Sequence, residues 1–319
     1  MIALSIIIPV WNDKTGLKRL LEQIIEYKIA SEVIICDDAS TDEHAPDAIG
    51  VANLDKLKWK YIRSDTQRGA GAMRNIGLKA ASCRHVLFFD SDDLLAPGIV
   101  KLLQDIDGKH FDFCIFRHHD SRVVNRRGTF DAEEKLWERA GAAETPRRIN
   151  MRESAELSRL SAYPWNKIYR KHFLTTEGIK CTEIPVHNDI ELHWTSFIAA
   201  QTILCSSIIG AEHFVQEGGG RLTNRRSAER LKIFEALNAT VERLHRTANR
   251  PFYVEPLIDF CVRTIGWAWG NIDSEHHGSF HRLSREFFLK SFTKEEITLA
   301  AYRNPASAGR LNRIISGGV

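Results

Sequence analysis

The sequence lacks the patterns of disulfide-rich, zinc-binding and membrane-spanning proteins. Its six cysteines are scattered without a C-x-x-C pair, so they predict buried free thiols in a reducing compartment. The longest uncharged stretch, residues 194–211, is interrupted by Ser, Thr and Gln and predicts a buried helix followed by a strand. No basic leader precedes the first apolar run. We therefore expect no secretion signal and no membrane span.

A strong net charge is also absent. The 44 Lys and Arg residues nearly balance the 41 Asp and Glu residues, and the formal charge of +3 argues against a nucleic-acid-binding protein. Basic residues do gather in residues 221–250. This stretch is either the solvated face of a helix or a surface that contacts an anionic membrane, and the sequence leaves both interpretations open.

What the sequence does contain is an alternation of strand and helix patterns. Residues 4–10 form a continuous apolar run, and the apolar residues that follow fall on one helical face. A helix rich in small residues is predicted at residues 69–82. Further strands are predicted at residues 32–36, 58–63, 86–89 and 111–116. Because strands alternate with helices, the sequence predicts an α/β fold with a doubly wound, mainly parallel sheet flanked by helices.

The pattern changes after residue 217. Three consecutive glycines mark a hinge, and residues 227–246 and 254–269 carry apolar side chains at helical spacing. We therefore predict an α/β domain at residues 1–217 and a helical C-terminal region at residues 218–319.

Two tryptophans and two pairs of histidines are assigned no role in ligand binding. Trp267 and Trp269 are flanked by apolar residues, which favours helix core over a surface that stacks on a sugar. The histidine pairs at residues 118–119 and 276–277 have no further metal ligands at a fitting spacing, so we place them in surface loops.

Two acidic loops follow predicted strands. Asp37 and Asp38 end the second strand, and the segment 90–93, Asp-Ser-Asp-Asp, ends the fourth. In open parallel sheets, ligands bind beyond the carboxyl ends of the strands. Carboxylates there can hold Mg²⁺ or Mn²⁺, and such a cation neutralises the charge that develops on a nucleoside diphosphate leaving group. Acidic turns also cap helices, so the acidic triplet alone leaves both interpretations open.

Four segments in order carry more information than the triplet. They are SIIIPVWN at residues 5–12, VIICDDASTD at 33–42, RGAGAMRNIG at 68–77 and FFDSDD at 88–93. In this arrangement the chain resembles the family 2 glycosyltransferases with the GT-A fold. The resemblance implies inverting transfer of a sugar from a nucleotide-diphosphate donor to a hydroxyl of a glycan, a lipid-linked sugar or a protein. It further implies bacterial surface-polysaccharide assembly in the cytoplasm. Peripheral contact with the inner face of the membrane is a separate hypothesis, which rests on the basic residues of the stretch 221–250.

The resemblance also implies roles for the residues of these segments. Asp92 matches the metal ligand, with Asp90 beside it on the metal or the ribose, and Asp37 and Asp38 are expected at the base or ribose. Arg74 is expected in the same cleft, where it binds the diphosphate or holds an aspartate of the acidic loops; a surface helix arginine is the alternative. The other expected donor-binding residues are Pro9, Val10, Asn12, Arg68, Ser91 and Arg221. Arg221 belongs to the glycine-rich stretch, which is either a lid over the donor or a plain linker.

Inversion by single displacement needs one base to take the proton of the acceptor hydroxyl. Family members often carry an acidic pair ending in Asp after a Trp-Asn-Lys-x-Tyr segment, and residues 165–169 of this chain, WNKIY, precede Asn188 and Asp189. The resemblance therefore places the base at Asp189, although Asn188 stands where an acidic residue is usual. Glu191 is the second candidate. The alternative for Asp189 is a helix N-cap.

Two other functions fit parts of the sequence. A sugar nucleotidyltransferase normally carries a phosphate loop rich in Gly and Lys after its first strand, whereas this chain has PVWN at residues 9–12. A non-catalytic nucleotide-sugar-binding or scaffold subunit would work through the helical C-terminus. The intact acidic cluster argues against that second alternative.

Overall fold

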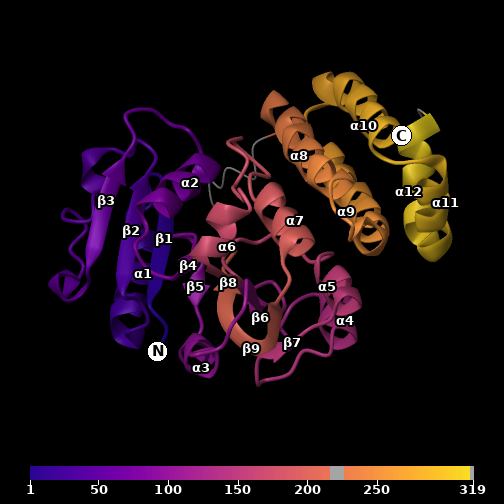
Figure 1. The fold of residues 1–319 in the computed structure, drawn as a ribbon. Helices are drawn as coiled ribbons and strands as arrows, with labels where there is room; N and C mark the ends of the chain where they lie inside the picture. Colours follow the sequence, from indigo (N-terminus) through magenta and orange to yellow (C-terminus); the bar gives the residue numbers. More distant parts are fainter. Residues whose placement is uncertain (216–225, 317–319) are drawn as a thin grey trace.

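The structure is a computed structural model that describes residues 1–215 and 226–316. One sheet flanked by helices makes up the first two thirds of the chain, and a group of helices follows it (Figure 1). The strands are β1 Leu4–Val10, β2 Glu32–Asp37, β3 Trp59–Arg63, β4 His85–Phe88, β5 Leu94–Leu95, β6 Phe113–Asp120, β7 Arg147–Arg148, β8 Lys167–Arg170 and β9 Ile203–His213. The helices around the sheet are α1 Lys14–Tyr27, α2 Ala70–Ala80, α3 Gly98–Asp105, α4 Asp131–Arg139, α5 Met151–Leu157, α6 Lys171–Thr176 and α7 Ile190–Ala199.

The strand order is β3-β2-β1-β4-β8-β6-β9-β5, and β7 pairs with β9. The predicted α/β fold is confirmed: β3, β2, β1 and β4 form a parallel half, and β6 and β9 are also parallel. The sheet is mixed because β8 lies antiparallel between β4 and β6, and β5 and β7 add antiparallel edges to β9. Since parallel neighbours need long crossovers, the chain leaves β6 and returns beside it as β9 only after a long excursion that includes β8, α6 and α7.

The central strand shows why continuous apolar runs form this sheet. Every residue of β1 is buried. Ile6 and Ile8 pack in the core beneath α1 and α3, whereas Ile7 packs in the core that contains residues of α2. A Cβ on Gly77 of α2 would lie only 2.3 Å from Ile7, so the small residue lets this helix approach the strand closely. Both faces of the sheet are therefore covered, as parallel strands require.

The C-terminal helices pack against the α/β part. They are α8 Ile233–His245, α9 Arg250–Gly270, α10 His277–Ser291, α11 Lys294–Arg303 and α12 Pro305–Ser316. Helix α8 lies beside α7, and α9 lies beside α5, while α11 and α12 form the far edge (Figure 1). The Tyr253 hydroxyl on α9 forms a 2.7 Å hydrogen bond with Ser154 on α5. The predicted helical region is thus confirmed, and the predicted boundary after residue 217 lies outside the described residues.

Several smaller predictions have different outcomes. All six cysteines are free and most are buried. Among the described residues, no helix combines the length and the apolar character needed to cross a bilayer. The loop prediction for the histidine pairs is wrong, because residues 118–119 lie in β6 and residue 277 begins α10. Trp269 does pack against the core, but Trp267 is 48% exposed, so its assignment to the helix core is wrong.

Candidate active site

A cleft of about 680 Å³ opens at the carboxyl ends of β1 and β4. Its walls bring together most of the residues expected from the sequence, namely Pro9, Val10, Asn12, Asp38, Arg74, Asp90, Ser91, Asp92 and Asp189. Asp37 and Arg68 are not among the lining residues. Arg221 lies outside the described residues.

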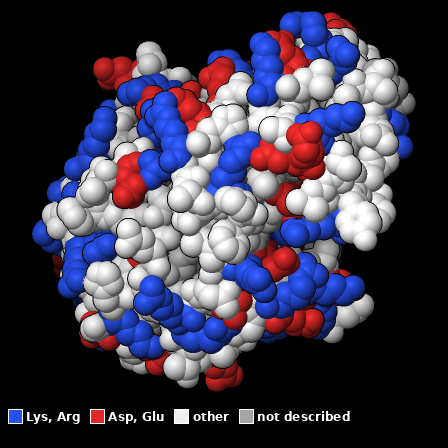
Figure 2. All heavy atoms as spheres, turned by 45° about the vertical axis from the view of Figure 1, so that its right-hand side comes forward, with Lys and Arg blue, Asp and Glu red and all other residues white. Residues whose placement is uncertain are grey.

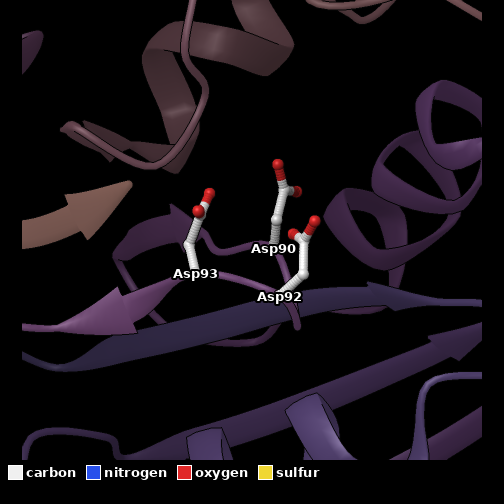
Figure 3. A group of neighbouring side chains, drawn as sticks. All are labelled: Asp90, Asp92 and Asp93. Atoms are coloured by element: carbon white, nitrogen blue, oxygen red, sulfur yellow. The ribbon is translucent and has the colours of Figure 1, made fainter. Parts of the chain in front are cut away.

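The acidic loop after β4 is the candidate metal-binding site. One carboxylate oxygen from each of Asp90, Asp92 and Asp93 lies within 4.8 Å of the others. Figure 3 shows the three side chains pointing toward the same side of the loop. An all-oxygen donor set of this kind fits Mg²⁺ or Mn²⁺ and does not fit the nitrogen and sulfur preference of zinc.

Two of these aspartates are also held by protein groups. Asp93 Oδ1 accepts hydrogen bonds from His213 Nδ1 at 2.9 Å and from the backbone N–H of Phe214 at 3.0 Å. The acidic loop is thereby tied to the end of β9. Asp90 Oδ1 accepts from Arg74 Nη2 at 2.5 Å. Charged and backbone donors of this type stabilise ionised carboxylates, which is the form that binds a cation.

Ser91 fixes the same loop to the first helix. Its hydroxyl donates to Asp13 Oδ2 at 2.7 Å, and Asp13 Oδ1 in turn accepts from the backbone N–H of Gly16 as the N-cap of α1. The expectation that Ser91 contacts the donor stays a prediction. The hydrogen bond to Asp13 shows that Ser91 also holds the acidic loop in position.

Arg74 crosses the cleft between the two acidic segments. It is 4% exposed, so the alternative of a surface arginine is excluded. While Nη2 binds Asp90, Nη1 donates to Asn188 Oδ1 at 2.6 Å. The guanidinium therefore holds an aspartate of the acidic loop, one of the two roles expected for it. Asn188 therefore offers Arg74 a neutral acceptor. An acidic residue at this position would place a second carboxylate on the same arginine, opposite Asp90.

Asp189 follows Asn188 on the same wall and precedes α7. It occupies the N-cap position, but its side chain accepts no capping hydrogen bond, so the helix-cap alternative is not supported. Burial raises the pKa of Asp189 to about 6, and the nearby charge of Arg74 opposes that rise. A carboxylate whose pKa lies this close to neutrality is suited to accept a proton. Glu191, the second candidate, does not line the cleft and accepts a hydrogen bond from Thr182 at 2.6 Å.

The WNKIY segment supports this wall from behind. Lys167 is fully buried, and its Nζ donates to the carbonyl of Tyr163 and to Asn166 Oδ1, both at 2.7 Å. Burial lowers the pKa of Lys167 to about 7, while the charge of Asp189 acts in the opposite direction. The lysine thus orders the segment that leads to the cleft.

The first acidic loop has a mainly structural set of contacts. Asp38 accepts the backbone N–H groups of Arg68 at 2.6 Å and Gly69 at 2.8 Å, which closes the turn before α2. Gly69 has φ of +88°, a conformation that L side chains rarely adopt. Asp37 is buried beneath and accepts from the hydroxyls of Ser40 and Tyr61. Donor contacts by Asp37 and Asp38 remain predictions.

Three lining aromatic residues were not among the expected site residues. Tyr163 stacks on Trp165 with ring centroids 4.6 Å apart, and His213 lies 4.9 Å from Tyr163. They come from the segment before β8 and from the end of β9. Nothing in their sequence spacing indicates that they meet, because the pairing of β8 and β9 with β6 brings them together.

The sequence of the chain matches a known family of enzymes. The sequence model of glycosyl transferase family 2 matches residues 5–170, about half of the chain, so the chain belongs to this family. EpsH of Bacillus subtilis, which is named as a glycosyltransferase, is 26% identical over 194 residues, covering 59% of this chain and 52% of EpsH. The poly(ribitol-phosphate) β-N-acetylglucosaminyltransferase TarS of Staphylococcus aureus is 32% identical over 133 residues, covering 40% of this chain and 22% of TarS.

The comparison with solved structures concerns the fold. The crystal structure of TarS residues 1–349 in complex with UDP-GlcNAc superposes with a TM-score of 0.75 at 20% identity, covering 98% of this chain and 90% of that chain. The C-terminal helical region is therefore included in the shared fold. By sequence, the chain spans about half the length of EpsH and about a fifth of TarS.

Proposed function

We propose that this chain is an inverting glycosyltransferase that moves a sugar from a nucleoside diphosphate to an acceptor hydroxyl, with Asp189 as the base. The observation that carries the proposal is that Asp189 shares one cleft with Asp90 and Asp92. The two acidic segments are joined through Asn188 and Arg74. One cleft thus offers groups for both ends of the reaction, since in single displacement the diphosphate leaves from one side of the anomeric carbon while the acceptor attacks from the other.

In the proposed reaction, Asp189 accepts the proton of the acceptor hydroxyl while the oxygen of that hydroxyl attacks the anomeric carbon of the donor sugar. The new glycosidic bond forms as the bond to the diphosphate oxygen breaks, and the configuration at that carbon is inverted. Asp90 and Asp92, with Asp93 as a third ligand, would hold Mn²⁺ or Mg²⁺, which neutralises charge on the leaving diphosphate. Pro9, Val10 and Asn12 would lie against the nucleotide end of the donor.

The relatives suggest the class of donor and acceptor. TarS is crystallised with UDP-GlcNAc, and the Escherichia coli relative WfgD is named for transfer from UDP-Glc to a diphosphoundecaprenol-linked GlcNAc. We therefore propose a UDP-activated hexose or N-acetylhexosamine as donor and a cell-surface glycan or lipid-linked sugar as acceptor. Residues 1–217 would bind the donor. The free buried cysteines support a reducing, cytoplasmic setting for this activity.

Binding to an anionic membrane stays a hypothesis. Fewer basic side chains support it than the sequence suggests, because several of them pair with acidic residues. Several basic side chains of residues 226–250 have partners within the chain: Arg226 pairs with Asp273, Arg243 with Glu177, Arg246 with Glu242 and Arg250 with Glu296. On the side of the molecule that Figure 2 draws, basic side chains are spread over the surface and interspersed with acidic ones. The hypothesis would be refuted if the fraction of protein that sediments with vesicles depended on neither the anionic lipid content nor the salt concentration.

The experiment that tests the proposed function is nucleotide release from UDP-glucose, UDP-GlcNAc and GDP-mannose with Mn²⁺ and methyl β-glycosides as acceptors, followed by NMR of the new glycosidic bond. Wild type should turn over one donor class with inversion. Asp189→Asn should lower turnover by roughly two to four orders of magnitude with donor affinity almost unchanged. Glu191→Gln should stay near the wild-type rate. Retention of configuration, or normal turnover in Asp189→Asn, would refute the assignment of the base.

A further inference from the structure

One large aromatic side chain of the C-terminal region stands beside the cleft and is open to solvent. Trp267 lies on α9 and is 48% exposed. The Arg230 guanidinium lies over its ring, 4.7 Å from the centroid. The His187 ring meets it at an interplanar angle of 87° with centroids 5.6 Å apart. About half of the surface of Trp267 remains accessible after these two contacts.

His187 connects this tryptophan to the catalytic wall. It lines the cleft two residues before Asp189 and has a left-handed backbone with φ of +63°. Burial lowers the pKa of His187 to about 3, and the charge of Arg230 acts in the same direction, so the imidazole is neutral at physiological pH. Trp267 does not line the cleft itself, but it contacts the uncharged ring of a residue that lines the cleft two positions before the candidate base.

Helix α9 is fixed to the α/β part, so the position of Trp267 is determined. Arg159 forms ion pairs with Glu255 and Asp259 of α9. Phe260 packs edge-on against Trp194 of α7 with centroids 5.3 Å apart. A side chain mounted in this way loses little conformational freedom when a ligand covers it, which favours its use as a binding surface.

From these contacts we infer that Trp267 is a platform for the acceptor, and that it binds a sugar ring through its exposed indole surface. The inference rests on the proposed function and assigns the acceptor side of that site to a residue of the C-terminal helices. The C–H bonds on one face of a pyranose carry a weak positive charge and suit the negative face of an indole. Arg230 is only 1% exposed, so an incoming group meets the aromatic ring of Trp267 and not the cation.

The test is saturation-transfer NMR of the full chain with the methyl β-glycosides of glucose, galactose and N-acetylglucosamine. Wild type should transfer saturation to the ring C–H protons of at least one glycoside. Trp267→Ala should reduce that signal about tenfold, since an aromatic contact of this kind contributes roughly a factor of ten to binding. Trp267→Phe should keep most of the signal. Tyr302→Ala is the matched control, because Tyr302 is an aromatic residue of α11 and is 83% exposed.

Calorimetric titration of the same proteins with UDP separates this inference from the proposed function. Unchanged UDP affinity in Trp267→Ala, together with loss of glycoside binding, supports the platform and shows that the variant is folded. Wild type that binds UDP but none of the glycosides overturns the platform alone, as does equal glycoside binding by Trp267→Ala. Weaker UDP binding with unchanged glycoside binding would instead place the tryptophan at the nucleotide.

Discussion

Arg74 donates from Nη2 to Oδ1 of Asp90 at 2.5 Å, and both residues of this ion pair line the cleft, with the arginine side chain 5% exposed. A second bond from Nη1 reaches Asn188. Arg74 is buried while the Asp90 side chain is 24% exposed, so removing the arginine leaves a partly buried charge uncompensated, and we expect Arg74→Met to lower the free energy of unfolding by about 2 kcal/mol. Arg74→Lys keeps the charge but cannot span both acceptors and should lower donor affinity.

Urea unfolding and donor titration measure these two effects. The control is Lys79→Met on the same helix, whose exposed side chain should change stability by no more than about 0.5 kcal/mol. An Arg74→Met variant as stable as wild type would show that the pair does not hold the loop.

The raised pKa of Asp189 predicts the pH dependence of turnover. A base works in its ionised form, and the pKa of this carboxyl is about 6. The rate at saturating donor should therefore be level above about pH 7 and fall about tenfold per unit well below pH 6. Steady-state rates between pH 4.5 and 8.5 check this. A rate that stays level down to pH 4.5 would assign proton transfer to another group.

The same shift predicts a trade-off between stability and activity. In the unfolded chain an Asp has a pKa of about 3.9, below the folded value of about 6 for Asp189. A raised carboxyl pKa means that the folded state binds more protons, so this group costs stability as the pH rises from about 4 to about 6. Asp189→Asn should thus be more stable than wild type at pH 7, with a gain that shrinks toward pH 4. Thermal unfolding at both pH values decides, and a variant less stable at pH 7 contradicts the burial argument.

Asp38 should matter for stability as well as for any donor contact. Its two carboxylate oxygens accept the N–H groups of Arg68 and Gly69, so Asp38→Ala leaves two donors without an acceptor. We expect the free energy of unfolding to fall by about 2 kcal/mol. Asp42→Ala is the comparison, since the Asp42 side chain is 92% exposed and its ion pair with Arg63 contributes little. Equal stability of the two variants would argue that the turn before α2 is held by other contacts.

Much of the α/β half was predictable because its strands are continuous apolar runs that fill both faces of a sheet. β1, β2, β3 and β4 and the helix α2 lie where the sequence placed them. The acidic loops follow from the same pattern, since they end buried strands. The assignment of Asp189 as the base came from resemblance to the family. The structure adds the position in the cleft and the burial that such an assignment needs.

Other features depend on contacts that a linear pattern does not encode. The insertion of β8 between β4 and β6 is set by tertiary pairing, and it brings Tyr163 to the cleft. The bond from Arg74 to Asn188 joins residues more than a hundred positions apart. Trp267 has apolar neighbours in sequence, which indicated burial, yet α9 presents this residue to the solvent beside His187.

The measurement that tests the account most directly is calorimetric binding of UDP, GDP and their sugar conjugates, with and without Mn²⁺, to wild type and to Asp92→Ala. If Asp92 holds a cation at the donor site, wild type should bind one nucleotide class in a metal-dependent way, and Asp92→Ala should lose this binding. Binding of none of these nucleotides, or equal metal-dependent binding by Asp92→Ala, would contradict that expectation.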